Sequence, residues 1–152
     1  MNPKTKYFFQ VPLQSDLASL ALLILRLVAG IAFMIHGWGK IQHPFDWMGA
    51  EAAVPGLFQF LAAFSEFFGG LAWILGLVTP VASLGLAFTM LVAFLMHAIA
   101  LHAPFVSPQG GPSFEPAMGY FAIALVLLFA GPGRRSLDKA LFGTKAGSAS
   151  LT

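Results

Sequence analysis

The chain has 152 residues, of which 58% are hydrophobic and only 9% charged, and its mean hydropathy is +0.82. Soluble domains carry about 25% charged residues, so eight basic and six acidic residues are too few to cover a water-facing surface. Lipid is the solvent that fits such a composition. The bases lie near the two ends of the chain and form no stripe, which excludes a nucleic-acid-binding surface. Cysteine is absent, which excludes a thiol nucleophile or a thiolate metal site.

Four apolar stretches follow one another, each close to the length of about 20 residues that a helix needs to cross a bilayer. The first is predicted to begin after Ser15 and Asp16, which favour helix starts, and to end before Pro44. Prolines or the Gly131-Pro132-Gly133 motif separate or end the later stretches. The predicted spans are residues 17–41, 56–78, 81–103 and 117–130.

These spans predict an all-α fold, an integral membrane antiparallel four-helix bundle. The transmembrane domain is expected over residues 17–133, after a cytoplasmic N-terminal segment over 1–16. Residues 134–152 are expected to form a cytoplasmic interfacial segment and a disordered tail. A cleaved signal peptide is the competing interpretation of the N-terminus, but its apolar region would be shorter and would lack a charge such as Arg26.

The distribution of basic residues predicts the orientation. Lys4 and Lys6 precede the first span, and four further bases follow the last span. Between the spans, the only base is Lys40, at the edge of the first loop. Because cytoplasmic loops are enriched in Lys and Arg, both termini are expected on the cytoplasmic side, which requires an even number of crossings.

Arg26 and Glu66 are the two charges predicted to lie deepest in the membrane. A charge near the bilayer centre costs at least about 2.5–3.5 kcal/mol on insertion scales, so it usually faces the bundle interior and finds a partner. Both residues lie about ten positions inside their helices. We therefore expect an Arg26–Glu66 ion pair, serving either as a structural clasp or in holding a ligand or handling protons.

Small residues lie on the same helix faces as these charges. Gly37 shares a face with Arg26 and Lys40, and Gly70 lies one turn from Glu66. Small residues allow a neighbouring helix, or a flat ligand, to approach closely. Ordinary membrane packing explains most such glycines, so both interpretations stay open.

Two histidines, His36 and His97, are predicted in the outer third of the membrane, with Lys40, His102 and Glu115 slightly further out. This cluster predicts a polar pocket at the outer mouth of the bundle. Each histidine is either a buried neutral side chain with one hydrogen bond or a group that exchanges protons with a ligand. A haem held by His36 and His97 is disfavoured, and no metal site is predicted, because His97 and His102 are five residues apart and point to different faces.

The residues just described resemble the DoxX family of small bacterial membrane proteins. The resemblance covers about residues 17–138. It rests on Arg26, Gly30 and Phe33 followed by Ile35-His36-Gly37-Trp38-Gly39-Lys40; on Glu66-Phe67-Phe68-Gly69-Gly70 and Leu75-Gly76-Leu77-Val78-Thr79; and on Met90, Ala93, His97, Glu115 and the run from Gly131 to Asp138. Arg135 departs from it, since many relatives have an aromatic residue there.

The resemblance implies a four-helix protein of the bacterial cytoplasmic (inner) membrane, similar to the DoxD-type subunit of thiosulfate:quinone oxidoreductase. It therefore implies a membrane component of a quinone-linked redox system, with a redox partner protein supplying or receiving electrons. In this hypothesis the candidate catalytic residues are His36, His97 and Glu115. The candidate cofactor-binding residues, with quinone as the cofactor, are Arg26, Lys40, Glu66, Gly37 and Gly70.

A non-enzymatic membrane scaffold or small-solute carrier is the alternative hypothesis. Nothing except Arg26, Glu66 and the histidines interrupts the apolar spans, which favours a scaffold. No broken helix pair of the inverted-repeat kind supports a carrier. The sequence leaves open whether the chain is itself catalytic and whether it forms a homo-oligomer.

Overall fold

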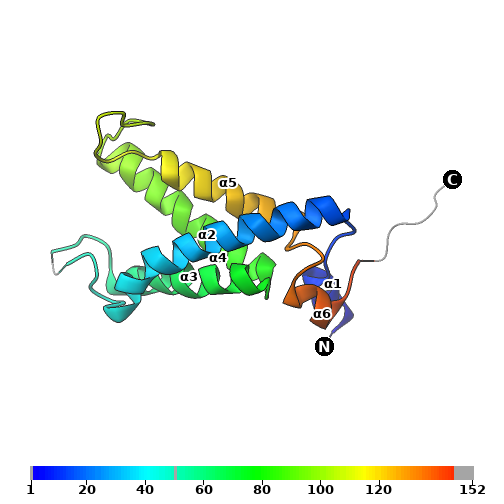
Figure 1. Ribbon diagram of the computed structural model, residues 1–152. Coiled ribbons are helices and arrows are strands. Elements are labelled where there is room, and N and C mark those ends of the chain that lie inside the picture. Colours follow the sequence, from blue (N-terminus) through cyan, green and yellow to red (C-terminus); the bar gives the residue numbers. More distant parts are fainter. Residues whose placement is uncertain (1, 50, 146–152) are drawn as a thin grey trace.

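The computed structural model describes residues 2–49 and 51–145 and is all-helical, as predicted. Within these residues, extended pairing is limited to one isolated bridge between Val11 and Thr144. The end of the predicted disordered tail, residues 146–152, lies outside the described residues. The helices are α1 (Pro3–Phe9), α2 (Asp16–Gln42), α3 (Gly56–Leu75), α4 (Thr79–Leu95), the π-helical turn η1 (Met96–Ala100), α5 (Glu115–Ala130) and α6 (Leu137–Phe142) (Figure 1).

Among the described residues, three helices are long and apolar enough to cross a membrane: α2 with 27 residues, α3 with 20, and the continuous helix formed by α4 and η1 with 22. The fourth apolar helix, α5, has 16 residues, or about 24 Å at 1.5 Å per residue. This is shorter than the hydrocarbon core of about 30 Å. The described residues thus contain three candidate membrane-spanning helices, and the crossing by α5 stays a prediction.

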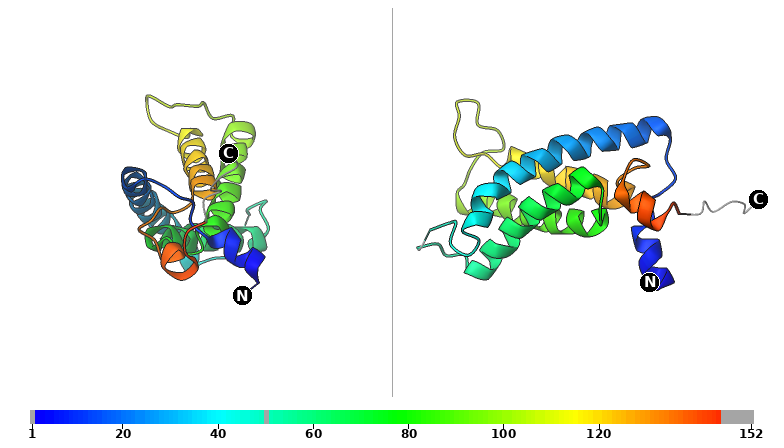
Figure 2. Two further views of the ribbon diagram at one scale, coloured as in Figure 1. Left: turned by 90° about the vertical axis from the view of Figure 1, so that its right-hand side faces the viewer. Right: turned by 60° about the horizontal axis from the view of Figure 1, so that its bottom comes forward.

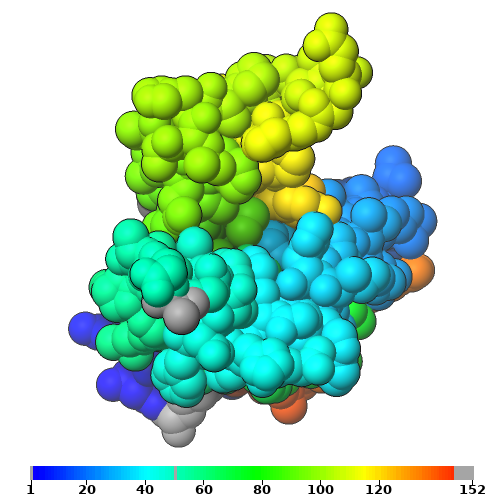
Figure 3. Space-filling model, turned by 90° about the vertical axis from the view of Figure 1, so that its left-hand side faces the viewer, coloured from blue at the N-terminus to red at the C-terminus, as the bar shows by residue number. Residues whose placement is uncertain are grey.

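The helices pack as two antiparallel hairpins, α2–α3 and α4–α5 (Figure 1). One end of the molecule, where α2 ends and α5 begins, is called here the loop end. The opposite end, where α1, α6 and the α3–α4 turn lie, is the terminal end (Figure 2). The hairpins are close together toward the terminal end and diverge toward the loop end. A hollow between them is visible from that side (Figure 3).

The first hairpin is tight because glycines let the two backbones meet. A Cβ atom on Gly30 would lie 2.7 Å from the carbonyl oxygen of Gly70, and one on Gly37 would lie 2.6 Å from the amide nitrogen of Phe67. Real side chains do not reach such separations, so this crossing requires glycine.

A small core joins the hairpins around Trp73. Its ring meets Phe33 edge-on at 5.4 Å between centroids, and its Nε1 donates to Ser83 Oγ at 2.9 Å. Leu86 and Leu127 complete the buried cluster from α4 and α5. An indole N–H in an apolar site needs a partner, and Ser83 provides it across the α3–α4 interface.

Candidate functional site

The predicted ion pair between Arg26 and Glu66 is not formed. Arg26 is 1% exposed, and its guanidinium donates to four backbone carbonyls instead. Nε donates to Trp73 O at 2.7 Å and Nη2 to Ile74 O at 3.0 Å, both at the end of α3. Nη1 donates to Pro132 O at 2.6 Å and Arg135 O at 3.0 Å. Arg26 therefore ties α2 to the end of α3 and to the segment after α5, and its atoms face backbone rather than a ligand.

The Arg26–Glu66 pair was predicted because the second helix was assumed to end at the same membrane depth at which the first helix begins. In the structure, Gly76 adopts a left-handed conformation (φ 63°) and ends α3 beside Arg26. That point is ten residues into α2. Glu66 is consequently displaced toward the loop end, and the free carbonyls at the end of α3, which carry partial negative charge, become the partners of Arg26.

Asp138 is a buried charge whose partner the sequence analysis did not identify. It is 0% exposed, and its two carboxylate oxygens accept from the amides of Val78 at 2.6 Å and Thr79 at 2.8 Å. These amides belong to the first turn of α4, which has no other side-chain cap. Asp138 therefore caps α4 from a segment 60 residues later, and only its place in the family-like motif marked it in the sequence.

Glu66 instead pairs with Lys40. The Nζ atom lies 2.6 Å from Oε1 and 2.7 Å from Oε2 of Glu66, linking α2 to α3 near the loop end. The Glu66 side chain is 4% exposed and that of Lys40 is 27% exposed. Lys40 was expected at the outer mouth of the bundle, and its long side chain extends from there to the buried carboxylate of Glu66.

Trp47 covers this ion pair from the loop that follows α2. Its ring centroid lies 4.5 Å from Lys40 Nζ, a cation–π arrangement. Gln59 on α3 holds the loop in place: its carbonyl accepts from Trp47 Nε1 at 3.0 Å, and its side chain accepts from the amide of Met48 at 3.0 Å. The Trp47 ring, held in place by these hydrogen bonds, thus packs against one side of the ion pair.

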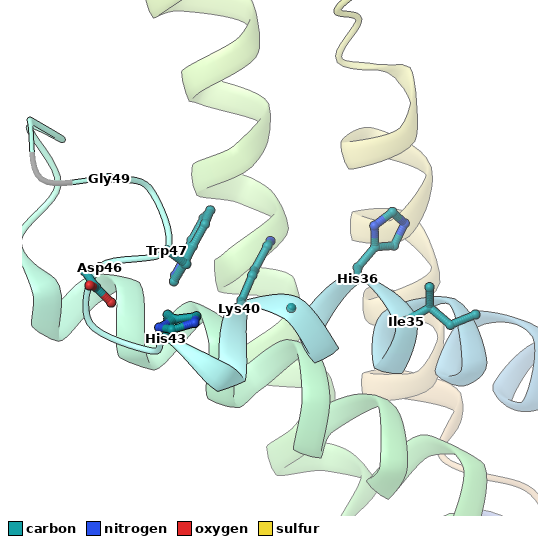
Figure 4. Close-up of a pocket in the computed structure, with 8 residues that line it drawn as sticks. Ile35, His36, Lys40, His43, Asp46, Trp47 and Gly49 are labelled. Carbon is teal, nitrogen blue, oxygen red and sulfur yellow. The ribbon is translucent and has the colours of Figure 1, made fainter.

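A polar pocket of about 580 Å³ lies next to the ion pair at the loop end (Figure 4). His36, Lys40 and Trp47 project to the same side of α2, toward α4 and α5, as Figure 4 shows. Of the residues that line the pocket, His36 and Lys40 were predicted at the site, whereas His43 and Asp46 were not, because both lie beyond the predicted end of the first helix. The lining residues are Ile35, His36, Gly39, Lys40, His43, Asp46, Trp47 and Gly49.

A second, apolar groove of about 560 Å³ lies between α2 and α5. Glu115 borders this groove rather than the polar pocket. The rings of His36 and Tyr120, one from each cavity, have centroids 6.4 Å apart and meet edge-on. The lining residues are Leu25, Val28, Ala29, Glu115, Pro116, Gly119, Tyr120 and Ile123.

The other predicted site residues lie elsewhere. Gly37 and Gly70 lie at the α2–α3 crossing, where the neighbouring helix occupies the space that a flat ligand was expected to use. His97 lies in η1, where its Nδ1 is 2.8 Å from Ala93 O of the preceding turn. It does not line the polar pocket. Across the described part of the chain, no three His, Asp or Glu side chains are grouped to hold a metal ion.

Long apolar helices, a lipid-facing surface rich in exposed Leu, Ile, Val and Phe, and a buried ion pair define an integral membrane protein. The DoxX family model matches residues 21–99, and the chain belongs to the DoxX family. It is similar to the inner membrane protein YqjF of Escherichia coli (strain K12), with 33% identity over 132 residues, covering 82% of this chain and 95% of that protein. No solved structure matches the chain significantly.

Proposed function

We propose that this chain is an inner-membrane component of a quinone-linked redox system and that the polar pocket receives the quinone ring. The supporting observation is the Lys40–Glu66 pair, two charges held at 2.6 Å beside a pocket of about 580 Å³. Charged side chains inside a bilayer are costly and usually handle ions, protons or ligands. Small-molecule sites typically have volumes of about 300–1,000 Å³, so the pocket suits a single ring.

The donors in the pocket fit a ring that carries carbonyl oxygens. Lys40 has three N–H donors, and Glu66 does not use all of them, so one is free to donate to a ligand oxygen. His36 lines the same pocket, and its two ring nitrogens can donate or accept a hydrogen bond. Trp47 offers a flat face against which a ring stacks. Each group would therefore bind the ring, orient it or exchange a proton with it.

A quinone takes up two electrons and two protons to become a quinol. In this proposal the protons pass through His36 and the Lys40–Glu66 pair, which lie at the pocket. The electrons come from a redox partner protein or from a reduced sulfur substrate, because cysteine is absent from the chain. The protein's own contribution is binding and proton transfer at a fixed place in the membrane.

Charge distribution supports an orientation with the terminal end in the cytoplasm. The terminal end carries six of the eight bases and two acids, whereas the loop end carries one base and four acids. By the positive-inside rule the pocket then faces the outer side of the inner membrane, and α5 completes an even number of crossings. The bases at the terminal end are Lys4, Lys6, Arg134, Arg135, Lys139 and Lys145.

Quinone binding by the purified protein tests this function. Solvent extraction of protein purified in mild detergent is expected to recover quinone, and a tail-less benzoquinone is expected to quench tryptophan fluorescence with a measurable Kd. Lys40→Gln is expected to weaken that Kd by about tenfold or more, the loss of one charge-assisted hydrogen bond. Lys6→Gln, at the terminal end, is the matched control and should leave the Kd unchanged. Protein that contains no quinone and binds none, but co-purifies with a soluble partner, would favour the non-enzymatic scaffold.

A further inference from the structure

The polar pocket and the apolar groove occupy successive stretches of one face of α2. Leu25, Val28 and Ala29 border the groove, and Ile35, His36, Gly39 and Lys40 border the pocket. Residues three or four apart in a helix lie on the same side, and the series 25, 28, 32, 35, 39 and 43 follows this spacing. Both cavities therefore lie along a single line on α2.

Aromatic rings form the junction between the two cavities. Tyr120 of α5 lies 4.8 Å from Phe33 and 6.4 Å from His36, measured between ring centroids. Phe33 is buried beneath them. The polar pocket and the apolar groove thus adjoin where the His36 and Tyr120 rings meet edge-on.

The groove exists because α5 leans away from α2 toward the loop end (Figure 3). Its α2 wall is open to the surroundings: Val28 is 67% exposed. In a membrane this opening faces hydrocarbon, since Val28 lies within a span. The groove is lined mainly by apolar residues, with Glu115 at the first turn of α5 and Tyr120 as its polar members.

We infer that the two cavities form one bipartite site for an amphiphile with a single ring headgroup and one long isoprenoid or acyl chain. The headgroup occupies the polar pocket, and the chain lies in the α2–α5 groove, so that the ligand enters sideways from the bilayer. The inference rests on the proposed function, and it adds the ligand's shape and its route. The ligand's hydrocarbon chain gains little free energy by moving from lipid into the groove, because both surroundings are apolar. The groove therefore serves as an opening through which this hydrocarbon chain extends into the bilayer while the ring occupies the pocket.

Two glycines allow each cavity to be blocked separately. Gly39 lines the pocket and Gly119 lines the groove, and a Cβ atom on either would have no neighbouring heavy atom within 4 Å. Both lie inside helices, where leucine is a better helix former than glycine. Gly39→Leu and Gly119→Leu are therefore expected to fold and to fill their own cavity only. Val28→Phe narrows the groove from the opposite wall and serves as a second, independent variant.

The test compares a tail-less benzoquinone with a quinone carrying a ten-carbon chain, by fluorescence quenching in detergent. Gly39→Leu is expected to weaken the Kd of both ligands by about tenfold or more. Gly119→Leu and Val28→Phe are expected to weaken the long-chain ligand to that extent and the tail-less one by less than about twofold. If the groove variants weaken both ligands equally, or neither, the bipartite site is wrong while the proposed function stands. If neither ligand binds the unmodified protein, the proposed function fails and the inference fails with it.

Discussion

Lys40 on α2 and Glu66 on α3 form a two-point ion pair, with the Nζ atom 2.6 and 2.7 Å from the two carboxylate oxygens. The pair links the two helices of one hairpin near the loop end, where the hairpins diverge. The Glu66 side chain is nearly inaccessible, whereas that of Lys40 is partly exposed and lines the polar pocket. One member is therefore fixed by burial, and the other is available to a ligand.

Removing Lys40 alone should destabilise the protein more than removing both charges. Lys40→Met leaves the Glu66 carboxylate buried without a partner, and breaking a buried pair in this way typically costs about 3–5 kcal/mol. In the double variant Lys40→Met with Glu66→Gln no charge remains, and most of the loss should be recovered. Thermal unfolding in detergent micelles, arranged as a double-mutant cycle, measures the difference. The cycle also needs the single variant Glu66→Gln, and a double-variant loss equal to the sum of the two single losses would show that the pair contributes no coupling.

Arg26→Leu should lower stability in a way that a change at Glu66 does not repair. The variant removes four hydrogen bonds to carbonyls that stay buried, and each unsatisfied buried group costs about 1–3 kcal/mol. Arg26→Lys should recover only part of the loss, because an ammonium cannot reproduce the planar fork of the guanidinium. The melting temperature checks both expectations. Rescue of Arg26→Leu by Glu66→Gln would instead support a direct Arg26–Glu66 interaction.

Asp138→Ala should destabilise the terminal end by about 1–3 kcal/mol, because two amides at the start of α4 lose their acceptor. Asp138→Asn keeps one acceptor oxygen and should cost less. Asp16 provides the control: it pairs with Arg134 at 2.7 Å but is exposed, and exposed pairs contribute about 0–1 kcal/mol. Hydrogen exchange of the Val78 and Thr79 amides measures the effect locally. Unchanged protection in Asp138→Ala would contradict the capping role.

Gly70→Ala and Gly119→Ala should have opposite effects on stability: the first should lower it and the second should raise it. A Cβ atom on Gly70 would lie 2.7 Å from Gly30 O and 2.9 Å from Phe33 Cβ, so the hairpin must separate, at a cost of about 1–3 kcal/mol. At Gly119 the space is open, and alanine should stabilise the helix by about 0.5–1 kcal/mol. Unfolding temperatures of the two variants compare them directly. A neutral Gly70→Ala would mean that the crossing is looser than described.

The four apolar helices α2 to α5 could be predicted because each is an apolar run bounded by proline, glycine or a helix-start residue, whereas the short helix α1 was not predicted. The partners of the buried charges could not be predicted from the sequence. Arg26 binds carbonyls that become available only where Gly76 ends α3 and where the segment after α5 folds back, and no spacing in the sequence records either event. Lys40 illustrates the same limit, since its flexible side chain reaches Glu66 on the neighbouring helix from a position predicted at the outer mouth of the bundle. His36 and Lys40 were placed in one pocket because both were predicted at a similar depth near the outer end of the first helix, and the structure brings these two to the same pocket.

Quinone retention by the double variant Lys40→Met with Glu66→Gln tests the central claim most directly, because this variant separates binding from folding. It should fold with near-native stability, since no buried charge is left unpaired, yet it lacks the ammonium that faces the pocket. The account predicts that the unmodified protein purifies with bound quinone and that the folded double variant purifies without it. Equal quinone content in the two proteins would contradict a quinone site at the Lys40–Glu66 pair.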